Sequence, residues 1–383
     1  MQLNQAAQDA LPRIEWREAD QLHSALWRSE SGLAPPKRVV IADDRTTADA
    51  AYRLACEGTA LLWRGDFQNA RQLLLALGRR AERRPDKRLK GAATPLERFN
   101  WHRQAQSQRA RTLAMILLPF AENHQLPLRR APDVLQACSE AYGAGDVPYV
   151  VALRELLGVI GAHEWRKKGV EVPALGERIH PHYGVFAPIR SEYVDLVAAA
   201  SLPGKVLAFD IGTGTGVLAA LLARRGVARV IATDLDARAL ECARENITRL
   251  GMQDSVEVIQ ADLFPEGRAP LVVCNPPWIP ARPSSTLERA VYDPDGIMLR
   301  GFLAGLVAHL QPGGEGWLIL SDLAEHLGLR TRAQLLELID HAGLKVVGRS
   351  ETRPHHPRSA DRTDPLHAAR AAERTSLWRL AVR

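Results

Sequence analysis

The stretch FDIGTGTGVLAALLARRG, residues 209–226, decides the fold of the C-terminal half of this chain. An apolar run typical of a buried strand ends at Asp210, and an apolar segment typical of a helix begins at Val217. Three glycines alternate between them: Gly212, Gly214 and Gly216. Glycine lets the backbone take up positive φ and approach a ligand closely. The stretch therefore predicts a strand, a ligand-binding turn and a helix.

The turn differs from the dinucleotide-binding fingerprint G-x-G-x-x-G in two ways. Val217 stands at the sixth position of the fingerprint, where a glycine is required. Asp210 stands at the end of the strand, where its charge would repel a pyrophosphate and suit a cationic ligand. A dehydrogenase is also disfavoured because no catalytic His or Tyr motif accompanies the turn. We therefore expect a ligand that carries positive charge.

Strand and helix patterns alternate on both sides of this stretch. Runs of apolar and β-branched residues predict strands, and amphipathic segments between them predict helices. Strands separated by helices are typical of a parallel sheet that is covered on both faces. The strands are expected at residues 205–212, 229–236, 255–263, 270–277 and 314–322. Two more, at 344–353 and 375–382, have no predicted helix between them, so we expect them to be antiparallel.

The N-terminal part shows a different pattern of predicted strands and helices. We therefore predict two domains, residues 1–175 and 176–383. In the first, short strands are expected at 38–44 and 60–66. Five helices are expected, at residues 46–58, 67–80, 96–122, 131–143 and 148–165. The first domain is therefore predicted to be helix-rich, with a small α/β start.

The charge of the chain is uneven. The formal net charge is +6, but residues 64–130 alone hold 15 Lys and Arg against 5 Asp and Glu. A basic segment on an otherwise mildly acidic protein is typical of a polyanion-binding surface, here RNA. The alternative is a solvated helical face, because arginine is a good helix former.

The composition also bears on the compartment. Four cysteines are widely separated, which disfavours a zinc knuckle and a disulfide framework and favours a reducing cytosol. The longest apolar run is far shorter than a membrane span, so no membrane association is expected. The first residues lack the basic start and apolar block of a signal peptide. We therefore expect a cytoplasmic protein.

The next three predicted strands also end in polar side chains. Asp234, 24 positions after Asp210, can accept hydrogen bonds from both hydroxyls of a ribose. Asp236 is a better candidate than Asp234 for capping the helix that follows. Asp262 is placed to accept from an adenine amine, and N-P-P-W at residues 275–278 ends the fourth strand. Ligands of open α/β sheets bind at these carboxyl ends.

This combination resembles the class I S-adenosylmethionine-dependent methyltransferases over roughly residues 190–383. The resemblance implies a Rossmann-like seven-stranded sheet with an antiparallel last strand, and S-adenosyl-L-methionine as the cofactor. It implies that the glycine turn cradles the methionine part, that the second strand end binds the ribose and that the third binds the adenine. The cofactor-binding residues implied are Asp210, Gly212, Thr213, Gly214, Gly216, Asp234, Leu235, Asp262, Leu263 and Asn275.

The N-P-P-W segment resembles the N/D-P-P-Y/F/W signature of methyltransferases that modify an sp² nitrogen. Such a nitrogen is a poor nucleophile because its lone pair is delocalised. The Asn275 amide oxygen and the Pro276 carbonyl would each accept one of its N–H bonds and aim the lone pair at the methyl group. Trp278 would offer a flat face to a planar base or amide. The alternative is a plain strand end with Trp278 in the core.

Residues 180–197 are similar to the segment that covers the cofactor in the release-factor glutamine methyltransferases and the small-domain ribosomal-RNA guanine methyltransferases. Tyr183, Phe186, Pro188 and Arg190 are therefore candidates for contact with cofactor or substrate, and the first two and Arg190 in particular for contact with substrate. His180 and His182 have no evident partner ligands, so no metal site is predicted.

Three functions are compatible with these residues. The first is methylation of an exocyclic base amine in RNA, with the basic N-terminal domain binding the phosphates in a salt-dependent way. The second is methylation of a protein glutamine side chain, as in the release-factor enzymes. The third is a catalytically inactive, nucleic-acid-binding descendant of the fold. The intact acid, glycine and N-P-P-W set disfavours the third, and we favour RNA.

Overall fold

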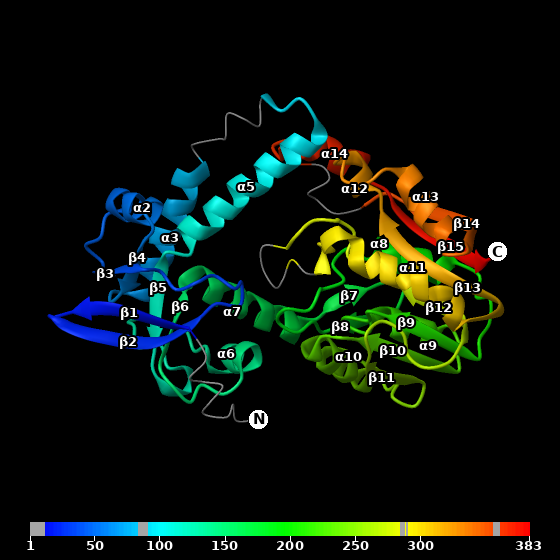
Figure 1. Ribbon diagram of the computed structural model, residues 1–383. Coiled ribbons are helices and arrows are strands. Elements are labelled where there is room, and N and C mark those ends of the chain that lie inside the picture. Colours follow the sequence, from blue (N-terminus) through cyan, green and yellow to red (C-terminus); the bar gives the residue numbers. More distant parts are fainter. Residues whose placement is uncertain (1–11, 83–90, 284–287, 289, 355–360) are drawn as a thin grey trace. The chain divides into compact units, whose positions relative to one another are not determined.

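The computed structural model describes residues 12–82, 91–283, 288, 290–354 and 361–383 (Figure 1). The chain divides into two compact units. The first consists of Met1–Gly91 and Asn100–Glu164, and the second of Ala92–Phe99 and Trp165–Arg383. Residues 83–90, which belong to the predicted basic segment, lie outside the described residues.

The second unit is built on a seven-stranded sheet in the order β11-β10-β9-β12-β13-β15-β14. The first five strands of this order are mutually parallel, and β15 is antiparallel to both β13 and β14. This topology confirms the predicted Rossmann-like seven-stranded sheet. The strands are β9 (Leu207–Ile211), β10 (Arg229–Asp234), β11 (Val256–Gln260), β12 (Ala269–Cys274), β13 (Leu310–Ser321), β14 (Leu344–Thr352) and β15 (Thr375–Val382).

Helices cover both faces of this sheet (Figure 1). Successive residues of a strand point to opposite faces. Ala208 and Val273 accordingly lie in one apolar cluster, and Phe209 and Val272 lie in the other. The helical elements are α8 (Glu192–Ala199), α9 (Val217–Arg224), α10 (Ala237–Arg249), η3 (Pro294–Gly296), α11 (Ile297–His309), α12 (Leu323–His326), α13 (Arg332–His341) and α14 (His367–Ala372).

Two local details of the second unit complete the comparison with the sequence. Asp236 is the N-cap of α10, as expected, and its side chain accepts a hydrogen bond of 2.8 Å from the Arg238 amide. The expectation of no helix between the last two strands is wrong, because α14 lies there. The pairing of those strands is nevertheless antiparallel, since six residues of helix do not form a crossover. A short hairpin of β7 (Val170–Val172) and β8 (Glu177–Ile179) precedes the sheet.

The first unit contains a six-stranded sheet in the order β1-β2-β6-β5-β4-β3. Its strands are β1 (Arg13–Glu18), β2 (Gln21–Arg28), β3 (Arg38–Ala42), β4 (Thr59–Trp63), β5 (Ile116–Phe120) and β6 (Tyr149–Ala152). Its helical elements are α2 (Ala48–Cys56), α3 (Phe67–Glu82), α5 (Pro95–Leu113), η1 (Glu122–His124), α6 (Leu135–Tyr142) and α7 (Leu153–Lys168), of which α5 and α7 also extend into the second unit.

The sequence predicted only two of these six strands, β3 and β4. The helix expected over residues 96–122 ends at Leu113, and β5 follows it. The helix expected over residues 148–165 likewise begins with the four residues of β6. Both strands are almost wholly buried and therefore apolar on both faces. A short apolar run of this kind has no alternation, so it extends an adjoining helical pattern without a visible break.

Candidate functional site

The three glycines of the turn after β9 all have positive φ, but each serves a different purpose. The φ angles are 69° at Gly212, 54° at Gly214 and 79° at Gly216. A Cβ atom at Gly212 would collide with Cε of Met298, and one at Gly216 would lie 3.3 Å from Cα of Ala243. A Cβ atom at Gly214 would meet no atom within 4 Å. The turn is thus packed at both ends and open in its middle, where a ligand has room.

Asp210 supports the turn from inside the protein. Its side chain is 1% exposed, and Oδ2 accepts hydrogen bonds from Thr213 Oγ1 at 2.6 Å and from the Ala219 amide at 3.1 Å. Burial raises the pKa of Asp210 to about 6, against the opposite effect of these two hydrogen bonds. The acid therefore braces the turn and the start of α9. Direct contact between Asp210 or Thr213 and a cofactor stays a prediction.

Asp234 joins the second strand end to the turn. Its Oδ2 accepts a hydrogen bond of 3.0 Å from the amide of Gly214, and its Oδ1 accepts one of 3.0 Å from the amide of Asp236. Burial raises the pKa of Asp234 as well. The neighbouring Leu235 is 64% exposed and leaves an apolar surface beside the carboxylate.

The end of β11 lies at the same edge of the sheet. The carbonyl of Leu263, a residue with φ of 68°, accepts a hydrogen bond of 2.6 Å from Thr233 Oγ1 of β10. Asp262 is exposed. The structure thus brings the glycine turn and the second and third strand ends together through hydrogen bonds, as the sequence predicted.

The N-P-P-W segment follows β12 directly. Asn275 is half-buried and Pro276 is buried. Trp278 Nε1 donates a hydrogen bond of 2.9 Å to Asn275 Oδ1. An indole N–H only donates, so it selects the oxygen of the amide and fixes which way the amide faces. Oδ1 keeps a second lone pair for another donor.

Trp278 is held in place from several sides. Its ring packs against three apolar clusters of the second unit, and the Arg190 guanidinium lies 4.9 Å from the ring centroid. Arg190 Nε donates to Glu192 at 2.8 Å, and its Nη2 donates to Glu373 at 3.0 Å. Both carboxylates are buried. Arg190, predicted as a substrate residue, therefore has partners within the protein, and one face of Trp278 is covered by it.

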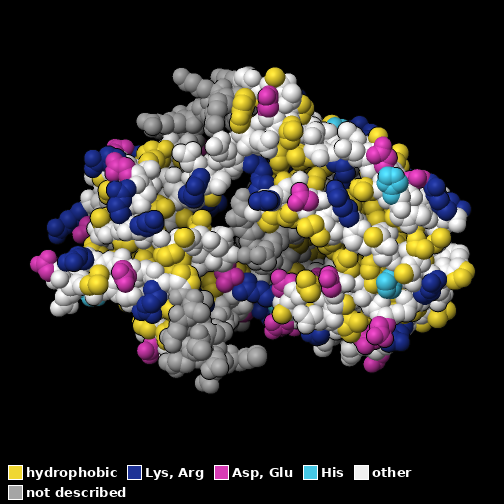
Figure 2. Space-filling model, viewed as in Figure 1, with side chains coloured by type: hydrophobic (Ala, Val, Ile, Leu, Met, Phe, Trp, Pro, Cys, Tyr) yellow, Lys and Arg dark blue, Asp and Glu magenta, His cyan; other side chains and the backbone are white. Residues whose placement is uncertain are grey.

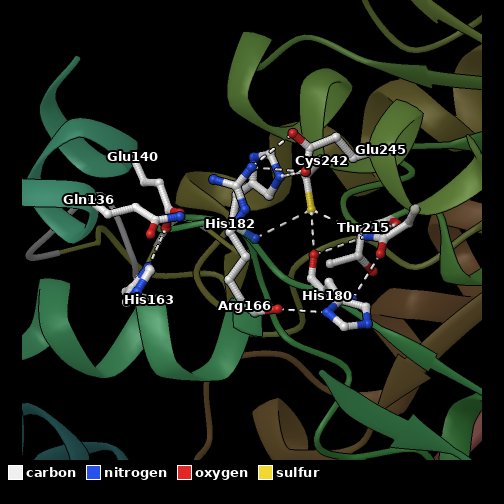
Figure 3. Close-up of polar contacts among 10 residues, drawn as sticks. Gln136, Glu140, His163, Arg166, His180, His182, Thr215, Cys242 and Glu245 are labelled. Atoms are coloured by element: carbon white, nitrogen blue, oxygen red, sulfur yellow. Dashed lines mark hydrogen bonds and ion pairs between the residues drawn. The ribbon is translucent and has the colours of Figure 1, made fainter. Parts of the chain in front are cut away.

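The segment before the turn is anchored to α10, as Figure 3 shows. The His180 amide donates to Asn246 Oδ1 at 2.8 Å, and Asn246 Nδ2 donates to the Thr215 carbonyl of the glycine turn at 3.1 Å. His182 Nε2 lies 2.8 Å from Glu245 Oε2. These contacts use both histidines, which the sequence left without a role. Nothing in the sequence around Glu245 and Asn246 indicated that α10 would anchor this segment.

The other two substrate candidates lie further along this segment. The Arg238 guanidinium of α10 lies 5.9 Å from the centroid of the Tyr183 ring. Phe186 is 40% exposed. Contact of either side chain with substrate stays a prediction.

No role for Asp293 follows from the sequence alone, although its segment Y-D-P-D-G resembles one in the glutamine methyltransferases. Its Oδ1 and Oδ2 accept hydrogen bonds of 3.0 and 3.1 Å from the amides of Met298 and Leu299, at the start of α11. Its own amide donates to the Ile279 carbonyl at 2.8 Å. Asp293 thereby ties the N-P-P-W-I segment to the helix whose Met298 packs on Gly212. An acid just before the helix-starting Pro294 was the available signal.

Among the described residues, neither a metal site nor a membrane-spanning helix is found. Over these residues, no group of three or more His, Cys, Asp or Glu side chains is arranged to hold a metal ion. Over the same part of the chain, no helix is both long and apolar enough to cross a bilayer.

Comparison with known proteins gives matches to methyltransferases. Residues 195–292 match the family described as ribosomal protein L11 methyltransferase (PrmA). A release factor glutamine methyltransferase of Cereibacter sphaeroides is 35% identical over 173 residues, which are 41% of this chain and 59% of that protein. A tRNA1(Val) (adenine(37)-N6)-methyltransferase of Bacteroides fragilis is 33% identical over 144 residues, 33% of this chain and 60% of that protein.

A methyltransferase of known structure from Pyrococcus furiosus has 21% sequence identity and a TM-score of 0.40, and the match covers 58% of this chain and 96% of that one. The chain spans less than two thirds of the length of the curated relatives named above. Over the part that they cover, the predicted resemblance to the class I S-adenosylmethionine-dependent methyltransferases is confirmed.

Proposed function

We propose that this protein is an S-adenosylmethionine-dependent N-methyltransferase that acts on an exocyclic base amine of RNA. The observation that carries the proposal is the arrangement at one sheet edge of an open glycine turn, a half-buried acid beside it and the Asn275 amide. Asp234 would hold the ribose, Asp262 would accept from the adenine amine with Leu235 nearby, and the opening at Gly214 would admit the methionine part. S-adenosylmethionine supplies a methyl group that its positive sulfur already activates.

The residues of this chain would act by positioning the acceptor nitrogen. The free lone pair of Asn275 Oδ1 and the Pro276 carbonyl would each accept one N–H of the planar amine. These bonds strengthen as the nitrogen moves towards tetrahedral geometry, so they favour the transition state over the ground state. Because Arg190 covers one face of Trp278, stacking of the base would use what remains of the indole surface. No strong general base is required.

The preference for RNA depends on the first unit, which we propose as the RNA-binding domain. Arg129 and Arg130 are 75% and 64% exposed, and they belong to the basic segment. Five arginines of that segment nevertheless form ion pairs with acids of the first unit: Arg64, Arg80, Arg109, Arg129 and Arg130. Figure 2 shows basic and acidic side chains interspersed over this unit. Phosphate binding would therefore involve exchange of these ion pairs and depend strongly on salt.

The second candidate is methylation of a protein glutamine, which the release factor relative supports. The same two acceptors would bind a side-chain amide equally well, because an amide nitrogen is also planar. We propose the cytoplasm as the compartment in either case, since RNA and translation factors are substrates found there.

A methyl-transfer assay separates these candidates. Total RNA and total protein from a strain lacking the enzyme are incubated with tritiated S-adenosylmethionine and the purified protein, with Asn275→Ala as the background control. We expect label in the RNA fraction. Label in the protein fraction alone would contradict RNA as the acceptor, and an absence of S-adenosylmethionine binding by calorimetry would contradict the whole proposal.

A further inference from the structure

One buried cation of the second unit has no role in the site described so far. Arg330 lies in the loop between α12 and α13 and is only 9% exposed. Its Nε and Nη2 atoms are buried and have no hydrogen-bond partner among the residues that the structure describes. Buried polar groups nearly always have partners, so an unpaired guanidinium needs a specific explanation.

The acids near Arg330 accept hydrogen bonds from other donors. The charges that act on its guanidinium are those of Glu325 and Asp293, which attract it, and that of Arg332, which repels it. Glu325 Oε1 accepts a hydrogen bond of 2.7 Å from Arg332, and both oxygens of Asp293 cap α11. Burial lowers the pKa of Arg330 below its ordinary value. The loop thus holds a desolvated positive charge that its neighbours attract but do not bind.

The loop that carries Arg330 adjoins elements that pack against the N-P-P-W segment, where the acceptor would bind. The Arg330 amide bonds to the Ala324 carbonyl of α12. Leu323 and Leu327 of the same region form an apolar cluster with Ile279, and Trp278 packs against that cluster. Asp293, whose charge reaches Arg330, bonds to the backbone of Ile279. Arg330 therefore lies on the elements that surround N-P-P-W.

We propose that Arg330 forms an anion subsite that binds a phosphate of the acceptor RNA beside the methylated nucleotide, once side chains around the loop between α12 and α13 move aside to expose the guanidinium. The planar fork of a guanidinium donates two parallel hydrogen bonds to a phosphate, and Nε and Nη2 are such a pair. A base that is modified on its amine must leave the stack, which brings its own phosphates close to the active site. A side-chain amide of a protein substrate carries no such anion. The inference rests on the proposed function and specifies the acceptor chemistry.

Two variants test the subsite against a merely structural role. Arg330→Met removes the fork and the charge but keeps most of the apolar stem, and Arg330→Lys keeps the charge without the fork. We expect Arg330→Met to raise the KM for total RNA at least about 10-fold, with the Kd for S-adenosylmethionine unchanged within 2-fold. Arg330→Lys should lie between Arg330→Met and the unaltered protein. Arg229→Gln, at the opposite edge of the sheet, is the matched control and should change neither value.

Thermal unfolding gives a readout that does not require the acceptor. Inorganic phosphate should raise the Tm of the unaltered protein relative to chloride at equal ionic strength, and it should not do so for Arg330→Met. Loss of an unpaired buried charge should also leave the Tm of Arg330→Met equal or higher. A lower Tm with an unchanged KM for RNA would overturn the subsite, because Arg330 would then only support the fold.

The subsite and the proposed function can fail separately. If RNA is methylated but Arg330→Met behaves as the unaltered protein does, the subsite is wrong and the function stands. If only protein is labelled but phosphate still raises the Tm through Arg330, the anion site stands and its assignment to RNA is wrong.

Discussion

The carboxyl ends of the parallel strands in the two units carry similar residues, but the two edges differ in what their acids bind. In the first unit, Asp44 follows β3 and pairs with Arg129 at 2.8 Å, and Asp66 follows β4 and pairs with Arg130 at 2.7 Å. In the second unit, Asp210 and Asp234 bind only N–H and O–H groups of the chain, and neither forms an ion pair among the described residues.

The loops at the two edges also differ in whether they leave open space beside a glycine. A Cβ atom at Gly65, after β4, would lie 2.5 Å from Oδ1 of Asp44, so the side chain of that acid fills the space beside the glycine. At Gly214 the corresponding space is open. An acid at a strand end is therefore not enough to indicate a ligand site. The site also requires a turn left open and an acid left without an internal cation.

The largest expected effect concerns Asn275, which directly follows β12 of the second unit. Asn275→Ala should lower kcat by about 10²–10³-fold or more, as is typical for loss of a transition-state hydrogen-bond acceptor or donor. The Kd for S-adenosylmethionine should stay within a few-fold, because the other cofactor-binding residues are intact. Single-turnover methyl transfer and calorimetry measure the two quantities. A large rise in Kd with unchanged kcat would contradict the assigned role.

Replacing one acid of each edge by alanine tests whether only the edge of the second unit binds the cofactor. Asp234→Ala should weaken S-adenosylmethionine binding by about 100-fold, the equivalent of two charge-assisted hydrogen bonds lost. Asp44→Ala removes the partner of Arg129 in the first unit and should leave the cofactor Kd unchanged. Calorimetry on both variants decides. Equal effects would mean that the first unit also binds the cofactor.

The acids of the two edges should make stability depend on pH in opposite directions, because the pKa of Asp210 is raised and that of Asp66 is lowered. Burial raises the pKa of Asp210 to about 6, whereas the hydrogen bond from Arg130 is the main cause that lowers the pKa of Asp66. The raised pKa of Asp210 means that its contribution to stability is fully present below its unfolded pKa of about 4 and is lost as the pH rises through about 6. The lowered pKa of Asp66 means that its contribution is present above pH about 4 and is lost only in stronger acid.

Asparagine variants measure this difference. Asp210→Asn should gain stability relative to the unaltered protein between pH 5 and 7.5, reaching on the order of 1–3 kcal/mol, because the buried charge is gone. Asp66→Asn should lose stability at pH 7, because the charge on Arg130 loses its partner. Thermal unfolding across this pH range gives both curves. A Tm difference for Asp210→Asn that does not change with pH would mean that Asp210 does not titrate there.

The sequence predicted the second unit far better than the first, for a physical reason. Each strand end of the second unit carries a residue whose chemistry is local: glycines with positive φ, a capping acid, two prolines that stop a strand. Such residues indicate their local backbone structure independently of the residues that pack around them. In the first unit, β5 and β6 are defined only by the strands beside them, so their sequences do not distinguish them from helix.

The partners of the site residues were beyond prediction for a related reason. Arg190 reaches Glu373, 183 residues further along the chain, and the amide of Asn246 reaches the carbonyl of His180. Each residue alone is compatible with a surface position. The pairs exist only after the sheet and its covering helices have brought these distant residues together.

The smallest effect we expect, and the sharpest test of how the open edge is organised, concerns the bond from Trp278 to Asn275. Trp278→Phe keeps an aromatic ring under Arg190 but removes the only atom of the side chain that selects the amide oxygen. The amide would then turn so that Nδ2 faces the acceptor in part of the molecules, and kcat should fall by about 5–10-fold, the equivalent of one hydrogen bond of about 1 kcal/mol. The KM for RNA and the cofactor Kd should change little.

Trp317→Phe is the matched control, because Trp317 also donates its indole N–H, to Glu315 at 2.8 Å, but lies in the core of the sheet. It should lower the Tm without changing kcat per folded molecule. If Trp278→Phe lowered only the Tm in the same way, the indole would serve the core alone. The amide of Asn275 would then take its orientation from the acceptor itself, and the open edge would be less preorganised than the hydrogen bond at 2.9 Å indicates.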